Sequence, residues 1–219
     1  MSSLSSFSSE DEEENNQQIK IVLLGSTGVG KTSIALRFTK GVFNLSQRPT
    51  IGSSFCVKRV TFNDYTLTLN IWDTAGEEQF QSLAKLYYRD ANISILCFDI
   101  TAEDTFSACN YWYHELTQSG PKDLLTIVIG NKSDLDSKRV VSVERAQEWA
   151  KKKNCLYFET SAKSGSNVEE LFENICKKYI QKTKERLDDE LMFNKRKTIN
   201  LLKDGDQTKD LPKKKSKCC

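Results

Sequence analysis

The string Gly25-Ser26-Thr27-Gly28-Val29-Gly30-Lys31-Thr32 restricts the fold of this chain more than any other feature. It has the pattern of a glycine, four residues, Gly-Lys and then Ser or Thr, and it lies between a largely apolar run at 19–24 and a segment of helical periodicity at 31–40. Glycines let successive backbone N–H groups turn toward phosphate oxygens, and a helix start adds its dipole. The string therefore predicts a strand, a phosphate-binding loop and a helix within an α/β domain.

The side chains of this loop suit a nucleotide with a metal ion. Lys31 supplies a compact positive charge to the β and γ phosphates, and the Thr32 hydroxyl is suitably placed to bind Mg²⁺. The residues expected to contact nucleotide here are Ser26, Thr27, Gly28, Val29, Gly30, Lys31, Thr32 and Ser33.

The rest of residues 19–182 alternates between strand and helix patterns. Runs at 93–100 and 124–130 are almost continuously apolar, as in parallel strands buried on both faces. Residues 53–73 alternate with period two around Asn63-Asp64, which predicts a β-hairpin. Helices are expected at 31–40, 103–118, 142–153 and 167–182. We predict a doubly wound, mostly parallel six-stranded sheet with one antiparallel edge strand and helices on both faces, and ligands outside the carboxyl ends of its strands.

The two ends of the chain have a different composition. Residues 1–18 are rich in serine, acids and amides, which predicts a disordered tail. Residues 183–219 are basic and are expected to form a flexible arm. Within that arm, 191–202 has enough apolar residues for a short amphipathic helix, but its period is irregular, so a solvated linker is favoured.

Composition and charge exclude several classes of protein. The 219 residues carry a net charge of +2 and have no apolar run long enough to span a membrane. The serine-rich, acidic N-terminus is unlike a secretory signal, which predicts a cytosolic protein. There is no basic stripe with interleaved aromatic residues, so nucleic acid is a poor candidate partner. We expect a monomer.

Two further oxygen donors are predicted to complete a magnesium site. Asp73 closes the second strand of the hairpin within Asp73-Thr74-Ala75-Gly76, where a carboxylate usually reaches Mg²⁺ through a water molecule. Thr50 lies on the loop before the hairpin, where its hydroxyl can approach the ion from the side of the γ-phosphate.

Asn131-Lys132-Ser133-Asp134 follows an apolar strand and indicates which base is bound. The Asp134 carboxylate can accept from both N1–H and the 2-amino group of guanine, whereas adenine offers neither donor. Asn131 can bond the N7 edge and Lys132 can lie along the ring, while Ser161-Ala162-Lys163 can offer the Ala162 N–H to O6. We predict GTP and GDP as ligands; an ATP-using kinase is a weaker alternative.

With these motifs in order, residues 19–182 resemble the Ras superfamily of small GTPases. The chain looks like a Rab protein in the strings 51–55, 69–73, 87–89 and in the terminal Cys218-Cys219. The strings 27–30, 51–55 and 82–84 are similar to the early-endosomal branch of Rabs. The resemblance implies a switch in vesicle and endosomal trafficking that acts on the cytoplasmic face of membranes.

The resemblance also implies how the switch is read and anchored. GTP would order the loops near 41–55 and 74–90 through Thr50 and the Gly76 N–H, and Phe43 would brace the guanine. Effectors would read an exposed triad of Phe55, Trp72 and Tyr87, although large aromatic residues are usually buried and a core position is the alternative. Geranylgeranyl groups on Cys218 and Cys219, next to a polybasic run, would anchor the chain. The implied partners are an exchange factor, a dissociation inhibitor, a prenyltransferase escort, effectors and a TBC-domain GTPase-activating protein.

Glu77 departs from the family pattern, which has a water-orienting Gln at this position. The catalytic groups implied are Glu77, Lys31 and Gly76. An ionised Glu can only accept hydrogen bonds and adds negative charge near a polyanion, so we expect slow hydrolysis unless an activator brings its own Arg and Gln. The Glu77 carboxylate can instead orient the attacking water itself or relay a proton. The alternative function is a persistently GTP-bound scaffold.

Overall fold

The computed structural model describes residues 16–62 and 65–204, and every structural statement below refers to them. The strands are β1 (Asn16–Leu24), β2 (Ser53–Phe62), β3 (Tyr65–Thr74), β4 (Ile93–Asp99), β5 (Leu125–Asn131) and β6 (Leu156–Glu159). The α-helices are α2 (Lys31–Lys40), α3 (Gln81–Tyr88), α4 (Glu103–Ser119), α5 (Val143–Lys152) and α6 (Val168–Asp204), and short 3₁₀ segments occur at η1 (Glu78–Phe80) and η2 (Ser133–Lys138).

The strands form one six-stranded sheet in the order β2-β3-β1-β4-β5-β6. Only β2 is antiparallel to its neighbour, and the hairpin β2–β3 places it at the edge, as predicted. β1 pairs with β3 on one side and with β4 on the other, so the direction of winding reverses at its carboxyl end. Ligands bind at this kind of switch point in open α/β sheets, and the loop after β1 is the predicted phosphate loop.

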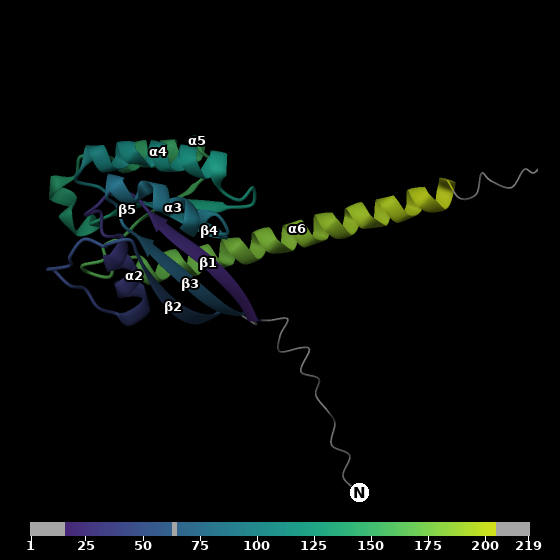
Figure 1. Ribbon diagram of the computed structural model, residues 1–219, viewed down its shortest axis with the longest axis horizontal. Coiled ribbons are helices and arrows are strands. Elements are labelled where there is room, and N and C mark those ends of the chain that lie inside the picture. The colour runs from purple at the N-terminus through teal and green to yellow at the C-terminus, as the bar shows by residue number, and fades with distance from the viewer. Residues whose placement is uncertain (1–15, 63–64, 205–219) are drawn as a thin grey trace, which may run out of the picture. The chain divides into compact units, whose positions relative to one another are not determined.

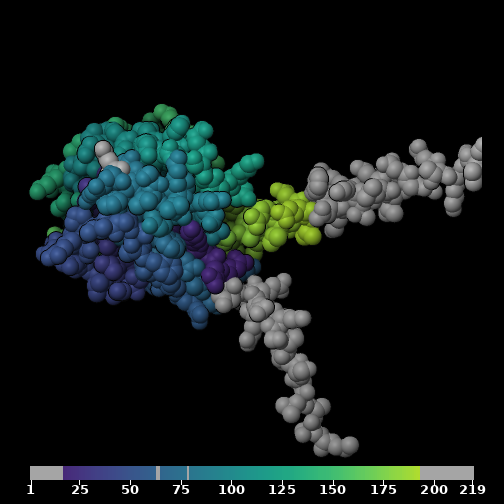
Figure 2. All heavy atoms as spheres, viewed as in Figure 1, coloured from purple at the N-terminus to yellow at the C-terminus, as the bar shows by residue number. Residues whose placement is uncertain are grey.

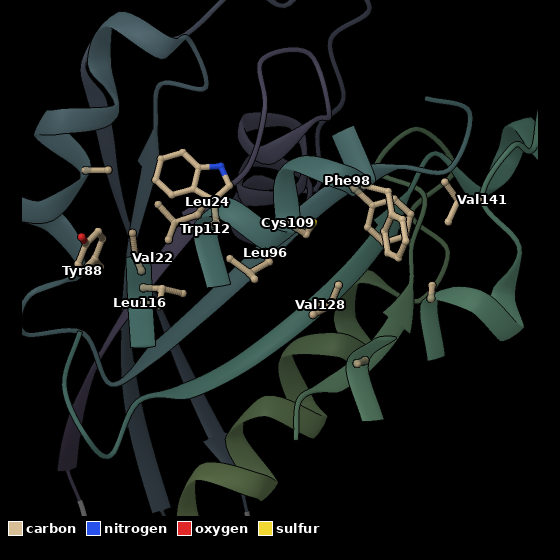
Figure 3. Close-up of a cluster of buried hydrophobic side chains, with 14 of the residues drawn as sticks. Val22, Leu24, Tyr88, Leu96, Phe98, Cys109, Trp112, Leu116, Val128 and Val141 are labelled. Carbon is tan, nitrogen blue, oxygen red and sulfur yellow. The ribbon is translucent and has the colours of Figure 1, made fainter. Parts of the chain in front are cut away.

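Helices cover both faces of the sheet (Figure 1). On one face, α3, α4 and α5 pack on side chains of β1, β4 and β5, and Figure 3 shows this cluster around Leu96 and Phe98. On the other face, α2 and the first turns of α6 meet through Phe38 and Phe172, whose stacked ring centroids are 3.6 Å apart. All seven residues of β4 are buried, which accounts for its continuous apolar sequence.

The chain contains two compact units, residues 1–176 and 177–219, and the sheet lies in the first. In the space-filling view of Figure 2, the purple and blue residues of the first part of this unit gather on one side and its teal residues gather on the other. No helix in the described part of the chain is long and apolar enough to cross a lipid bilayer.

Two element boundaries differ from the sequence-based expectation. β1 begins at Asn16 rather than at 19, because residues 16–18 pair in register with residues 66–68 of β3. α6 continues to Asp204, past the expected end near 182 and through the segment for which a linker was favoured. Residues 168–204 contain neither Gly nor Pro and are rich in strong helix formers, and Gly205 follows directly. Local helix propensity therefore outweighs the irregular apolar period.

Candidate functional site

A cavity of about 400 Å³ lies at the carboxyl ends of β1, β3 and β5, within the size range of small-molecule sites. Segments that are far apart in the sequence line it, among them the phosphate loop, the loop around Thr50 and the loops after β5 and β6. All predicted nucleotide-binding residues except Ser26, Val29 and Ser161 line it, namely Thr27, Gly28, Gly30, Lys31, Thr32, Ser33, Phe43, Thr50, Gly76, Asn131, Lys132, Asp134, Ala162 and Lys163.

Each of the three exceptions makes a hydrogen bond to a residue that lines the cavity. The Ser26 carbonyl accepts a 2.9 Å hydrogen bond from Lys31. The carbonyl of the buried Val29 accepts from the Asn131 amide at 2.8 Å. The hydroxyl of the buried Ser161 donates to Asp134 Oδ1 at 2.6 Å. They therefore hold lining residues in place.

The phosphate loop folds around the Lys31 side chain. Lys31 is only 6% exposed, and its Nζ donates to the carbonyls of Gly25 at 2.7 Å and Ser26 at 2.9 Å. Burial lowers the pKa of Lys31. An anion beside the ammonium group would oppose this effect, because it favours the charged form of the lysine. Gly30 has a φ of 101°, and a Cβ there would collide with the side-chain amide of Asn131. Only glycine suits this position.

The predicted magnesium donors lie in one cluster. Thr32 Oγ1 donates to Asp73 Oδ2 at 2.6 Å and is 2.8 Å from Thr50 Oγ1, and Ser54 Oγ also donates to Asp73 Oδ2 at 3.3 Å. Asp73 is fully buried, and its Oδ1 is the one buried side-chain polar atom in the described residues without a hydrogen-bond partner. Burial raises the pKa of Asp73 despite these hydrogen bonds. An oxygen donor set with an unpaired carboxylate oxygen fits a hard cation such as Mg²⁺.

On the opposite side of the cavity, Asn131 at the end of β5 links the phosphate loop to the loop after β6. Its Nδ2 donates to the Val29 carbonyl, and its Oδ1 accepts from the backbone N–H of Ala162 at 3.2 Å and from the Thr160 hydroxyl at 3.3 Å. The Asn131 amide nitrogen carries a second N–H, and both Asn131 and Ala162 line the cavity, so their contact with the base stays a prediction. Asn131 is 2% exposed, so both polar atoms of its side chain have partners in the surrounding protein.

Sequence reasoning missed two residues that hold these loops. Arg37 of α2 donates to the carbonyls of Ala162 at 2.8 Å and Lys163 at 2.7 Å. Asp99, the last residue of β4, lies 2.6 Å from the Lys132 Nζ. An acid at the carboxyl end of a buried strand was a usable signal for Asp99, whereas nothing in the helical pattern distinguishes Arg37.

Gly76 and Glu77, predicted to be catalytic, have different surroundings. A Cβ on Gly76 would collide with the phosphate-loop backbone at Ser26 and Thr27 and would lie 2.6 Å from Lys31 Nζ, so this glycine packs directly on the loop. Glu77 does not line the cavity. Its Oε2 accepts a 2.6 Å hydrogen bond from the side-chain amide of Gln79.

The predicted effector triad forms a continuous aromatic cluster. The Trp72 ring centroid is 5.0 Å from that of Phe55 and 5.4 Å from that of Tyr87. Phe55 is 52% exposed, whereas Trp72 and Tyr87 are half-buried against the core beneath α3. The cluster combines the two alternatives considered from the sequence. Cys218 and Cys219 lie outside the described residues.

Comparison with known proteins identifies the relatives of this arrangement. The model of the Ras family matches residues 20–181. Over 166 residues the chain is 43% identical to the Ras-related protein Rab-30 of Homo sapiens, with 76% of this chain and 82% of the relative covered. The Rab-30 proteins of Bos taurus and Mus musculus match with the same identity of 43% and the same coverage. The sheet order, the phosphate loop and these matches agree on a GTP-hydrolysing enzyme with the small G-protein fold. The chain therefore belongs to the Rab small GTPases of the Ras family.

Proposed function

We propose that this protein is a GTP-controlled switch of membrane trafficking that hydrolyses GTP slowly by itself and depends on an activating partner. The observation that supports it most is the cavity in which Lys31, the Thr32–Asp73 pair and Asp134 line or border one space. These groups would receive, in turn, the phosphates, a metal ion and a guanine base. Membership of the Rab family establishes that the reaction is GTP hydrolysis. The rate of hydrolysis and the residues that carry it out are proposed.

In this proposal each wall of the cavity binds one part of the nucleotide. The backbone from Ser26 to Gly30 and the Lys31 ammonium group bind the phosphates, Phe43 braces the base, and Asp134 accepts its N1–H and 2-amino protons. Thr32, Thr50 and, through a water molecule, Asp73 would hold Mg²⁺, which neutralises phosphate charge when bound. The unpaired Asp73 Oδ1 supports this assignment.

Glu77 is the reason to expect slow hydrolysis. A carboxylate in this position accepts hydrogen bonds but offers no donor to the γ-phosphate, and one of its oxygens is already bonded to Gln79. Gly76 packs directly on the phosphate loop, which supports the proposal that its N–H would bond the γ-phosphate. Lys31 would stabilise the charge that develops there. A TBC-domain activator would supply the missing donors.

The proposal extends to the partners and the membrane. Effectors would contact the cluster of Phe55, Trp72 and Tyr87 in the GTP-bound state. An exchange factor, a dissociation inhibitor and a prenyltransferase escort would act on the cycle, with geranylgeranyl groups on Cys218 and Cys219 as the anchor. We further propose an endosomal location, from the strings shared with the early-endosomal branch. Fluorescently tagged protein that stayed on another organelle in cells would contradict it.

Hydrolysis is tested by single-turnover phosphate release from protein loaded with GTP and Mg²⁺. The arms are the wild type, Glu77→Gln, and Glu144→Gln as a control for loss of an exposed charge on α5, each alone and with a panel of TBC-domain proteins. We expect slow release by the wild type alone, faster release by Glu77→Gln, and stimulation of the wild type by an activator. Turnover of the wild type alone within seconds would refute the slow switch. A wild type inert with every activator, beside an active Glu77→Gln, would favour the persistently GTP-bound scaffold.

A further inference from the structure

Lys132 has a constrained backbone and a fixed side-chain end. It adopts a φ of 68°, a left-handed conformation that is uncommon for a residue with a Cβ. Its side chain lines the nucleotide cavity, and its Nζ is 2.6 Å from Asp99 Oδ2. The backbone of this cavity-lining residue and the ammonium end of its flexible side chain are therefore both held.

Asp99 is itself a rigid anchor. Its Oδ1 accepts from the Thr101 backbone N–H at 2.8 Å and from the Thr101 hydroxyl at 2.7 Å, which leaves Oδ2 for Lys132. Its own backbone N–H donates to Thr105 Oγ1 at 3.0 Å. The residue is 7% exposed. Burial alone raises the pKa of Asp99, but the hydrogen bonds from Lys132 and Thr101 outweigh it and hold the pKa below its ordinary value, so the carboxylate is charged at neutral pH.

We infer that Asp99 is a positioning residue for the nucleotide site, which anchors the Lys132 ammonium group so that the Lys132 stem is already extended along the cavity wall when nucleotide arrives. The inference rests on the proposed contact between Lys132 and the guanine base. A free lysine side chain has several rotatable bonds, and ordering it on binding costs affinity. With Asp99 in place, the Lys132 side chain is already ordered in the folded protein, so binding of nucleotide does not have to order it.

The test is a double-mutant cycle on the rate at which a fluorescent GDP analogue dissociates from the Mg²⁺-loaded full chain. Asp99→Asn keeps an oxygen for Thr101 but replaces the acceptor of Lys132, and Lys132→Met keeps an apolar stem without the ammonium group. Each single change is expected to raise the dissociation rate about three- to tenfold, the equivalent of one side chain left to be ordered. The double variant should be less than twofold faster than Lys132→Met alone, because the two changes remove one interaction.

Two controls separate positioning from a general loss of structure. Asp104→Asn removes an exposed carboxylate of α4 and is expected to leave the rate unchanged. Lys132→Met tests the pair from its other end, so the inference remains testable if Asp99→Asn does not fold. Equal effects of Asp99→Asn in the wild-type and Lys132→Met backgrounds would overturn the inference, as would a wild-type rate in Lys132→Met. Lys31→Ala reports separately on the proposed function: if it retained GDP as the wild type does, the phosphate site itself would be wrongly assigned.

Discussion

Asn131→Ala is predicted to destabilise the folded protein as well as weaken nucleotide binding. The Asn131 side chain bonds the Val29 carbonyl at 2.8 Å and the Ala162 N–H at 3.2 Å, and these residues are 0% and 2% exposed. Truncation leaves the buried Ala162 N–H without this acceptor and leaves the Val29 carbonyl only the long 3.9 Å contact from the Cys97 thiol. Buried polar groups left unsatisfied cost about 1–3 kcal/mol each, and the thiol contact offsets part of the cost at Val29. We expect a loss of about 2–4 kcal/mol in the free energy of unfolding. For a domain of this size, that corresponds to a midpoint lower by about 4–16 °C.

The assay must separate this loss from the weaker binding of nucleotide. GDP stabilises the folded state by an amount that depends on its concentration and its Kd. The Kd of each variant is therefore measured from association and dissociation rates of a fluorescent GDP analogue. The difference in binding free energy at the working concentration is then subtracted from the difference in urea unfolding, and the remainder is the intrinsic cost of the lost hydrogen bonds.

The matched control is Asn174→Ala, which removes a half-buried asparagine whose amide makes a solvent-exposed hydrogen bond to the Glu170 carbonyl one turn earlier in α6. It is expected to change the free energy of unfolding by less than about 0.5 kcal/mol. A remainder below about 1 kcal/mol for Asn131→Ala would refute the reasoning, because it would mean that the two backbone groups find water or other partners.

Two further predictions concern Glu159, the last residue of β6, and Asp134, which lines the cavity. Glu159 accepts hydrogen bonds from Arg139 at 2.7 and 2.8 Å and from the Tyr157 hydroxyl at 2.6 Å. Burial alone raises the pKa of Glu159, but these hydrogen bonds hold the pKa below the ordinary 4.5. The charged Glu159 therefore stabilises the folded protein at neutral pH, and this stabilisation is lost as the pH falls below about 4.5 and through the lower pKa of the folded state. Urea unfolding of Glu159→Gln should give about 2 kcal/mol less stability at pH 7 and a shallower pH dependence below 4.5; an unchanged acid slope would contradict this. In Asp134→Asn the side chain offers one acceptor and one donor in place of two acceptors. Competition binding should therefore show a loss of GDP affinity of about 10- to 100-fold. The variant should prefer xanthosine diphosphate, whose base carries a carbonyl in place of the 2-amino group. Continued preference for GDP would argue against Asp134 as the base-reading residue.

Much of the fold was predictable because the strands are local patterns. The apolar runs predicted at 19–24, 93–100 and 124–130 correspond to β1, β4 and β5, and the predicted hairpin corresponds to β2 and β3. The end of α6 was not predicted, because the irregular apolar period of its second half was given more weight than the absence of helix breakers through Asp204. Periodicity measures burial, whereas continuation of a helix also depends on propensity.

The sequence by itself determined the phosphate loop, its position between strand and helix, and the set of side chains from Lys31 to Lys163 that line one cavity. These follow from motifs whose function depends on residue type and on neighbouring residues in the chain. Only the tertiary structure decided how the loops are held: Asn131 bonding Val29 and Ala162, Arg37 bonding the loop after β6, and Asp99 holding Lys132. These partners are separated by up to 126 residues, and their pairing depends on strand order and side-chain direction, which local sequence does not encode.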